Sequence, residues 1–149
     1  MIKKVLFLIL FLLASCGYQP LYSKKQLTKF TTKELQLIGD LDINKKIVSA
    51  LSIKIDKEKF QNNKILLNNK KRILETSKDK QGKPDSYKMI IDLKFLLIDK
   101  ENNLIEKNIS EEFSYKTKEN KFDLSEYEIN LEENLINNII EKLSIYISI

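Results

Sequence analysis

The strictest constraint on the fold is an alternation of apolar and polar side chains over residues 87–97. The apolar members of this run are Tyr87, Met89, Ile91, Leu93, Phe95 and Leu97, and the polar ones include Lys88, Asp92 and Lys94. A period of two over eleven residues predicts a β-strand with one face in a core.

A second alternating run follows a polar loop at 99–103 and predicts the return strand of a long hairpin. One face of this run carries Ile105, Ile109, Phe113 and Tyr115, and the other carries Glu106, Asn108, Ser110, Glu112 and Ser114. At least this part of the predicted sheet must therefore meet water or a polar partner on one side.

Two other segments have helical periodicity. In the first, Asp42 is a plausible N-cap after a turn at Gly39-Asp40, and the apolar stripe is Ile43, Ile47, Val48, Leu51 and Ile55. In the second, Ser125 and Glu128 have the spacing of a capping box. Its stripe is Leu124, Leu131, Leu135, Ile139, Leu143 and Tyr146, widened by Ile136 and Ile140. We expect both helices to face the core of the domain.

The rest of the chain gives weaker signals. Leu35 and Leu37 alternate with polar residues and predict a short first strand. Residues 65–67 and 73–74 predict two further strand pieces with a basic run between them, and 77–86 predicts a polar loop. The whole pattern predicts an α+β two-layer sandwich, with two helices on one face of a mostly antiparallel sheet of about four strands.

The N-terminus has the layout of an export signal. Lys3 and Lys4 precede an apolar run at 5–13, and two small residues then lead to Cys16. The run is too short for a transmembrane helix, which needs about 20 residues. The segment Leu13-Ala14-Ser15-Cys16 resembles the lipobox of bacterial lipoproteins, in which the Cys thiol receives diacylglycerol before cleavage. The alternative is an ordinary secretory signal that happens to contain the only cysteine of the chain.

A lipidated Cys16 would keep the mature protein on a membrane, because two or more acyl chains hold stably. Gly17, rather than Asp, follows the cysteine and favours the outer membrane by analogy with enterobacterial sorting. We therefore expect a signal peptide at 1–15, a lipidated tether at 16–32 and one periplasm-facing domain at 33–149.

Composition excludes several kinds of site. The chain has no His, no Trp and no second Cys, which removes Ser-His-Asp and Cys-His catalysis and His-containing zinc sites. A formal net charge of +5 is too mildly basic to indicate a nucleic-acid partner. Glu111-Glu112 should point to opposite faces of a strand, and Glu132-Glu133 should lie on the solvated side of a helix. We expect neither an enzyme nor a cofactor.

Three stretches together resemble the lipopolysaccharide (LPS) assembly lipoprotein family LptE, in its alphaproteobacterial form. They are the mature start Cys16-Gly17-Tyr18-Gln19-Pro20-Leu21-Tyr22, the strand 87–99 with its "Leu-x-Asp" end, and Phe113-Ser114-Tyr115 followed by Phe122 and the terminal helix. The resemblance implies a non-enzymatic plug inside the LptD outer-membrane β-barrel. It also implies binding of LPS through basic residues.

The basic residues best suited to lipid A phosphates form two clusters. We look for them where strands meet loops, since ammonium groups there can reach anions without burial. The candidates are Lys70, Lys71 and Arg72, and then Lys78, Lys80 and Lys83 around Gly82. Either cluster can instead be a solvated loop in a lysine-rich chain.

Two other functions are compatible with the sequence. One is a different small outer-membrane lipoprotein, with a structural or barrel-assembly role. The other is a lipoprotein that binds a soluble ligand, which would require a closed apolar pocket.

Overall fold

The computed structural model describes residues 31–56, 63–99 and 101–147. The predicted signal peptide, Cys16 and most of the tether lie outside the described residues. The last two residues predicted for the tether, Thr31 and Thr32, form a short strand, and Thr32 is fully buried.

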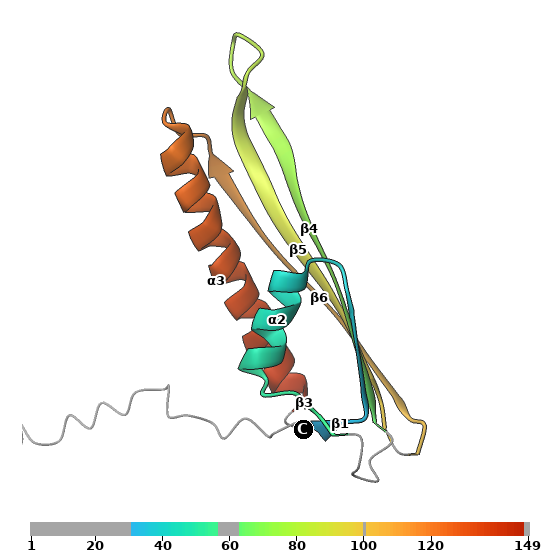
Figure 1. Cartoon of the computed structure of the whole chain (residues 1–149). Helices are drawn as coiled ribbons and strands as arrows, with labels where there is room; N and C mark the ends of the chain where they lie inside the picture. Colours follow the sequence, from blue (N-terminus) through green and yellow to red (C-terminus); the bar gives the residue numbers. More distant parts are fainter. Residues whose placement is uncertain (1–30, 57–62, 100, 148–149) are drawn as a thin grey trace, which may run out of the picture.

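Two helices cover one face of a four-stranded sheet (Figure 1). The strand order is β2-β4-β5-β6, in which β2 and β4 are parallel and the other pairs are antiparallel. A second, two-stranded parallel sheet joins β1 to β3. The elements are β1 (Thr31–Thr32), β2 (Glu34–Ile38), α2 (Leu41–Ala50), β3 (Lys54–Ile55), β4 (Lys64–Lys78), β5 (Pro84–Ile98), β6 (Leu104–Lys116) and α3 (Lys121–Ile147). The predicted α+β class and helix arrangement are confirmed.

The core lies between the helices and the sheet. The alternation over 87–97 places Met89, Ile91, Leu93 and Phe95 on the covered side, each 2% exposed or less. The α3 residues that close this core are Leu131, Leu135, Ile136, Ile139 and Leu143. Their spacing follows the predicted helical stripe, whereas Tyr146 at its end is 48% exposed.

Strand β4 is one continuous strand, so the prediction of two strand pieces is wrong. Residues 64–78 pair along their length with β5, with irregularities only near Glu75–Lys78. The loop between the strands is 79–83 and is shorter than the predicted 77–86. Polar side chains fit this strand because its central part has one uncovered face.

The first helix begins earlier than predicted. Its N-cap is Asp40, whose Oδ1 accepts hydrogen bonds from the backbone N–H groups of Asp42 and Ile43. Buried Asn69 fixes this turn, since its side chain accepts from Asp40 N at 3.1 Å and donates to Asp40 O at 2.9 Å. Gly39 has φ +94°, and a Cβ there would lie 2.0 Å from Asn69 O. The position of the N-cap at Asp40 therefore depends on Asn69, a residue far away in the sequence.

Two other predicted helix limits are wrong. The first helix ends at Ala50, and Ser52 at φ 52° turns the chain so that Ile55 belongs to β3 and is 56% exposed. Helix α3 starts at Lys121, where Asn120 Oδ1 accepts from Phe122 N at 2.8 Å. Ser125 is therefore inside the helix, and the predicted capping box does not form the helix start.

Candidate functional site

The face of the sheet opposite the helices is uncovered by any described element, and we call it the open face (Figure 1). It carries the side chains that alternate with the buried ones. These are Glu34, Gln36 and Ile38 of β2; Lys64, Leu66, Asn68, Lys70, Arg72 and Leu74 of β4; Ser86, Lys88, Ile90, Asp92, Lys94, Leu96 and Ile98 of β5; and Leu104, Glu106, Asn108, Ser110, Glu112, Ser114 and Lys116 of β6. The predicted polar face of β6 is confirmed.

Ion pairs cross the open face from strand to strand. Their N–O distances are 2.7 Å for Arg72–Asp92, 2.8 Å for Lys94–Glu106, 2.9 Å for Lys88–Glu112 and 3.0 Å for Lys64–Glu34. Cross-strand opposite charges of this kind stabilise a sheet modestly. They also give the face a polar surface of mixed sign.

Asp92 is the centre of this polar surface. Its carboxylate accepts a hydrogen bond from Ser110 Oγ at 2.7 Å and pairs with Arg72. The Ser110 hydroxyl first, and then Arg72, hold the pKa of Asp92 below its usual range. A shallow hollow of about 280 Å³ beside it is lined in part by Asn68, Lys70 and Lys94.

The structure separates the first predicted basic cluster. Lys70 and Arg72 lie on the open face, but Lys71 lies on the covered face and pairs with Glu132 of α3 at 2.8 Å. All three are in the middle of β4, so their expected place where a strand meets a loop is wrong. Among the described residues Lys70 has no ion-pair partner, and the buried Arg72 Nε has no hydrogen-bond partner. Lys70 therefore keeps an ammonium group that can bind an anion, whereas only the exposed part of the Arg72 guanidinium, which already pairs with Asp92, can reach one.

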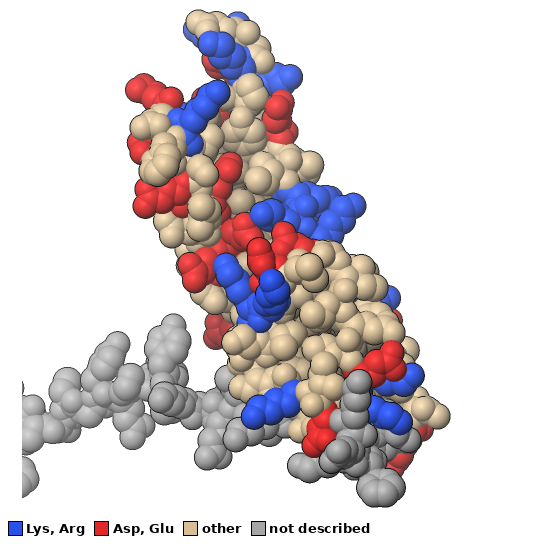
Figure 2. Space-filling model, in the orientation of Figure 1, with Lys and Arg blue, Asp and Glu red and all other residues tan. Residues whose placement is uncertain are grey.

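The second predicted cluster does lie where strands meet a loop. Lys78 ends β4, and Lys80 and Lys83 belong to the turn that follows. Asp79 Oδ1 closes that turn by accepting from the N–H groups of Gln81 and Lys83, and Gly82 supplies φ +81°. Figure 2 shows Lys and Arg side chains gathered at this end of the molecule.

We call the turn between β4 and β5 the tip, and Lys78, Lys80 and Lys83 the tip lysines. These lysines have few anionic partners. Lys78 lies 3.7 Å from Glu75, and within the described residues no ion pair involves Lys80 or Lys83. Lys78 lies eight positions along the strand from Lys70, or about 27 Å away. Two separate basic groups therefore exist, one on the open face and one at the tip.

Three of the four carboxylates in the predicted pairs form ion pairs, and Glu133 is exposed as predicted. Glu111 faces α3 and pairs with Lys142, while Glu112 faces the other way and pairs with Lys88, which confirms that they leave on opposite faces. Glu132 does not lie on a solvated side as predicted, because it is 20% exposed and bound to Lys71. None of these side chains lines the described hollows of the open face.

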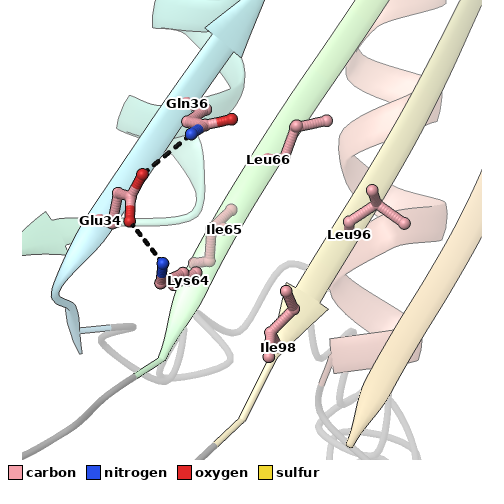
Figure 3. A pocket seen from close by; sticks show the side chains of 7 residues that line it. All are labelled: Glu34, Gln36, Lys64, Ile65, Leu66, Leu96 and Ile98. Atoms are coloured by element: carbon pink, nitrogen blue, oxygen red, sulfur yellow. Dashed lines mark hydrogen bonds and ion pairs between the residues drawn. The ribbon is translucent and has the colours of Figure 1, made fainter. Parts of the chain in front are cut away.

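The open face also carries an apolar area that was not predicted. Leu66, Leu96 and Ile98 line a hollow near the start of β2 (Figure 3). The signal was present in the unbroken apolar runs 65–67 and 95–98, which put apolar side chains on both faces of a strand.

Across residues 31–56, 63–99 and 101–147, no group of three or more Asp, Glu, His or Cys residues is arranged to hold a metal ion. Neither described helix combines the length and the apolar character needed to span a membrane.

Comparison with known proteins supports the fold. No protein-family model and no curated protein matches the sequence. The structure resembles rare lipoprotein B from Shewanella oneidensis at a TM-score of 0.59 and 12% identity, over 77% of this chain and 93% of that one. It also resembles a minor lipoprotein from Acinetobacter baumannii, at a TM-score of 0.54 and 11% identity, over 78% of this chain and 88% of that one. Lipoprotein B from Nitrosomonas europaea is similar at a TM-score of 0.54 and 11% identity, over 77% of this chain and 79% of that one. The chain shares the fold of these bacterial lipoproteins.

Proposed function

We propose that this chain is a lipid-anchored outer-membrane protein of the LptE type, which plugs and supports an LptD-type β-barrel and assists LPS assembly. It has no catalytic role in this proposal. The fold shared with the lipoproteins above and the lipobox-like residues ending at Cys16 support the anchor. The lipid would keep the domain on the periplasmic side of the outer membrane.

The observation that carries the proposal is the open face. A barrel lumen is polar, and a plug must present polar groups to it without leaving buried charges unpaired. The open face does this with most of its charges, though not Lys70, already paired within the described part of the chain, from Lys64–Glu34 at one end to Lys88–Glu112 near the other. Such a surface can meet a polar wall with a small desolvation cost.

Co-purification tests the partner. A tagged full-length chain, extracted from membranes in mild detergent, should bring down a large β-barrel of the LptD type. Recovery of a barrel-assembly machine, or of no barrel, would contradict the plug and favour an accessory lipoprotein instead.

For LPS we propose Lys70 and Arg72 on the open face and Lys78, Lys80 and Lys83 at the tip. Lys71 is left out because its ammonium pairs with Glu132 on the covered side. The tip should dominate, since its lysines are exposed and lie beyond the start of α3 (Figure 1). Each Lys near an anionic lipid surface contributes about 1 kcal/mol at moderate salt.

The triple change Lys78→Gln, Lys80→Gln and Lys83→Gln should weaken LPS binding roughly tenfold or more. The matched control is Lys45→Gln, Lys46→Gln and Lys54→Gln, which removes the same charge from exposed positions on α2 and β3. Equal affinity of the two triple variants for purified LPS at low salt would remove the tip from the proposal.

A further inference from the structure

One region of the open face combines apolar side chains with a single ion pair. A hollow of about 260 Å³ lies across β2, β4 and β5 and is lined by Glu34, Gln36, Lys64, Ile65, Leu66, Leu96 and Ile98. Figure 3 views it from the side opposite the helices, whose ribbons lie behind the strands. Leu66 pairs in register with Leu96, and Lys64 with Ile98, so the hollow follows two cross-strand rows.

The polar side chains that line the hollow bind one another. Glu34 Oε2 pairs with Lys64 Nζ at 3.0 Å, and Gln36 Nε2 donates to Glu34 Oε1 at 2.9 Å. These contacts satisfy the charged groups without a ligand. What remains for an occupant is the leucine and isoleucine surface.

The size of the hollow favours side chains over a small molecule. Ligand pockets are typically about 300–1,000 Å³, and this hollow is smaller and open to one side. Leu104 of β6, 60% exposed and in register with Ile98, extends the apolar surface to the fourth strand. A strip of this kind suits an extended peptide segment that inserts one or two apolar side chains.

The chain itself supplies such a segment. Strand β1 begins at Thr31, three residues before Glu34, and Glu34 lines the hollow, so the chain that precedes β1 is attached a short distance from it. Pro20-Leu21-Tyr22 is nine to eleven residues before Thr31 and can lie no more than about 40 Å from it. Its attachment makes docking intramolecular, with an effective concentration in the mM range.

Local chemistry also favours this segment. Pro20 fixes its own φ, which lowers the entropy lost on docking, and Leu21 and Tyr22 add apolar surface. Lys24 and Lys25 follow, and the β5–β6 loop next to Leu104 carries Asp99 and Glu101 with Lys100 between them, a net negative charge. The charges of the two sides are therefore complementary.

We propose that Pro20-Leu21-Tyr22 docks on the Leu66, Leu96 and Ile98 surface of the open face. Docking would leave about four to six residues between Cys16 and the domain, or roughly 20 Å of chain. If Cys16 carries lipid, as proposed above, this end of the sheet is then held close to the membrane. The docking itself does not depend on the lipid or on a barrel partner.

Disulfide trapping in the full-length exported chain tests the contact. The pair Tyr22→Cys with Leu96→Cys should form an intramolecular disulfide at least tenfold faster than Tyr22→Cys with Ser49→Cys. Ser49 is exposed near the end of α2, close to the β1–β3 pair but on the helix side, so an undocked segment could reach it. Peptide mapping identifies the bonded cysteines and, separately, reports whether Cys16 is lipidated.

A second measurement covers the case in which the cysteine pair disturbs folding. Leu96→Glu, checked for native circular dichroism, should speed trypsin cleavage at Lys24 and Lys25 several-fold, whereas Ser110→Glu on the same face should not. Equal trapping of Leu96 and Ser49, a mixed disulfide with another protein, or unchanged cleavage in the Leu96→Glu variant would each overturn the proposal.

Discussion

The two faces of the same three strands use charge in different ways. On the covered face, Lys71 pairs with Glu132 and Glu111 pairs with Lys142, and both pairs join the sheet to α3. On the open face, Arg72 and Glu112 are the next residues along, and they pair with Asp92 and Lys88 within the sheet. Adjacent residues therefore either hold the two layers together or shape a surface.

The difference extends to apolar residues. Phe95 is 2% exposed in the core, whereas Leu96 lies half-buried in the open hollow. Tyr115 also belongs to the covered face, where it stacks on Tyr87 and donates a 2.6 Å hydrogen bond to Glu128 of α3. Changes on the covered face should affect the fold, and changes on the open face should affect binding.

The largest effect should come from Phe95→Ala. Removing this ring leaves a cavity in the core and should lower the free energy of unfolding by about 3–5 kcal/mol. Leu96→Ala, one residue away, should cost less than about 1 kcal/mol. Urea unfolding measures both values, and equal losses would show that Leu96 contributes as much to the core as Phe95 does.

Tyr115→Phe should lower the free energy of unfolding by about 1–2 kcal/mol near neutral pH, because Glu128 loses a buried donor. Burial first, and then the hydrogen bond to Glu128, raise the pKa of Tyr115. The neutral phenol is thus favoured in the folded state, and its stabilisation is lost as pH rises above about 10.

Measuring the free energy of unfolding at pH 8 and pH 10.5 tests whether this stabilisation is lost at high pH. The wild type should lose more stability between the two values than Tyr115→Phe does. Tyr146→Phe, on an exposed residue of α3, is the control and should behave like the wild type. An identical loss in the Tyr115→Phe variant would refute the role of this phenol.

Lys71→Met should lower the free energy of unfolding by up to about 1 kcal/mol, since its partly buried pair joins β4 to α3. Lys70→Met on the open face should stay within about 0.5 kcal/mol of the wild type. A double-mutant cycle with Glu132→Gln isolates the pair, and zero coupling would contradict its role in holding the layers together.

The smallest effect should be on the loss of folding stability at low pH. Because the pKa of Asp92 is lowered, its contribution is present above about pH 4 and is lost as pH falls through the folded value. Asp92→Asn should reduce the loss of stability between pH 6 and pH 3 by less than about 1 kcal/mol, since the site is partly solvated. Ser110→Ala removes the main hydrogen-bond donor to Asp92 and should also reduce the loss of stability between pH 6 and pH 3.

The sequence by itself determined the hairpin of β5 and β6, the side chains on each of its faces, and the core stripe of α3. Alternation and helical spacing are local properties, and they assign residues such as Met89 and Ile139 to the covered side with no knowledge of what covers them. The basic turn around Gly82 was equally local, so its lysines could be named in advance.

Only the tertiary structure decided the continuity of β4, the N-cap at Asp40 and the different partners of Lys71 and Arg72. Each depends on a group far away along the chain: β5 for the strand, Asn69 for the cap, Glu132 and Asp92 for the two cations. A periodic pattern specifies which side chains share a face. The residues that meet that face, or leave it open, follow from the packing of distant segments.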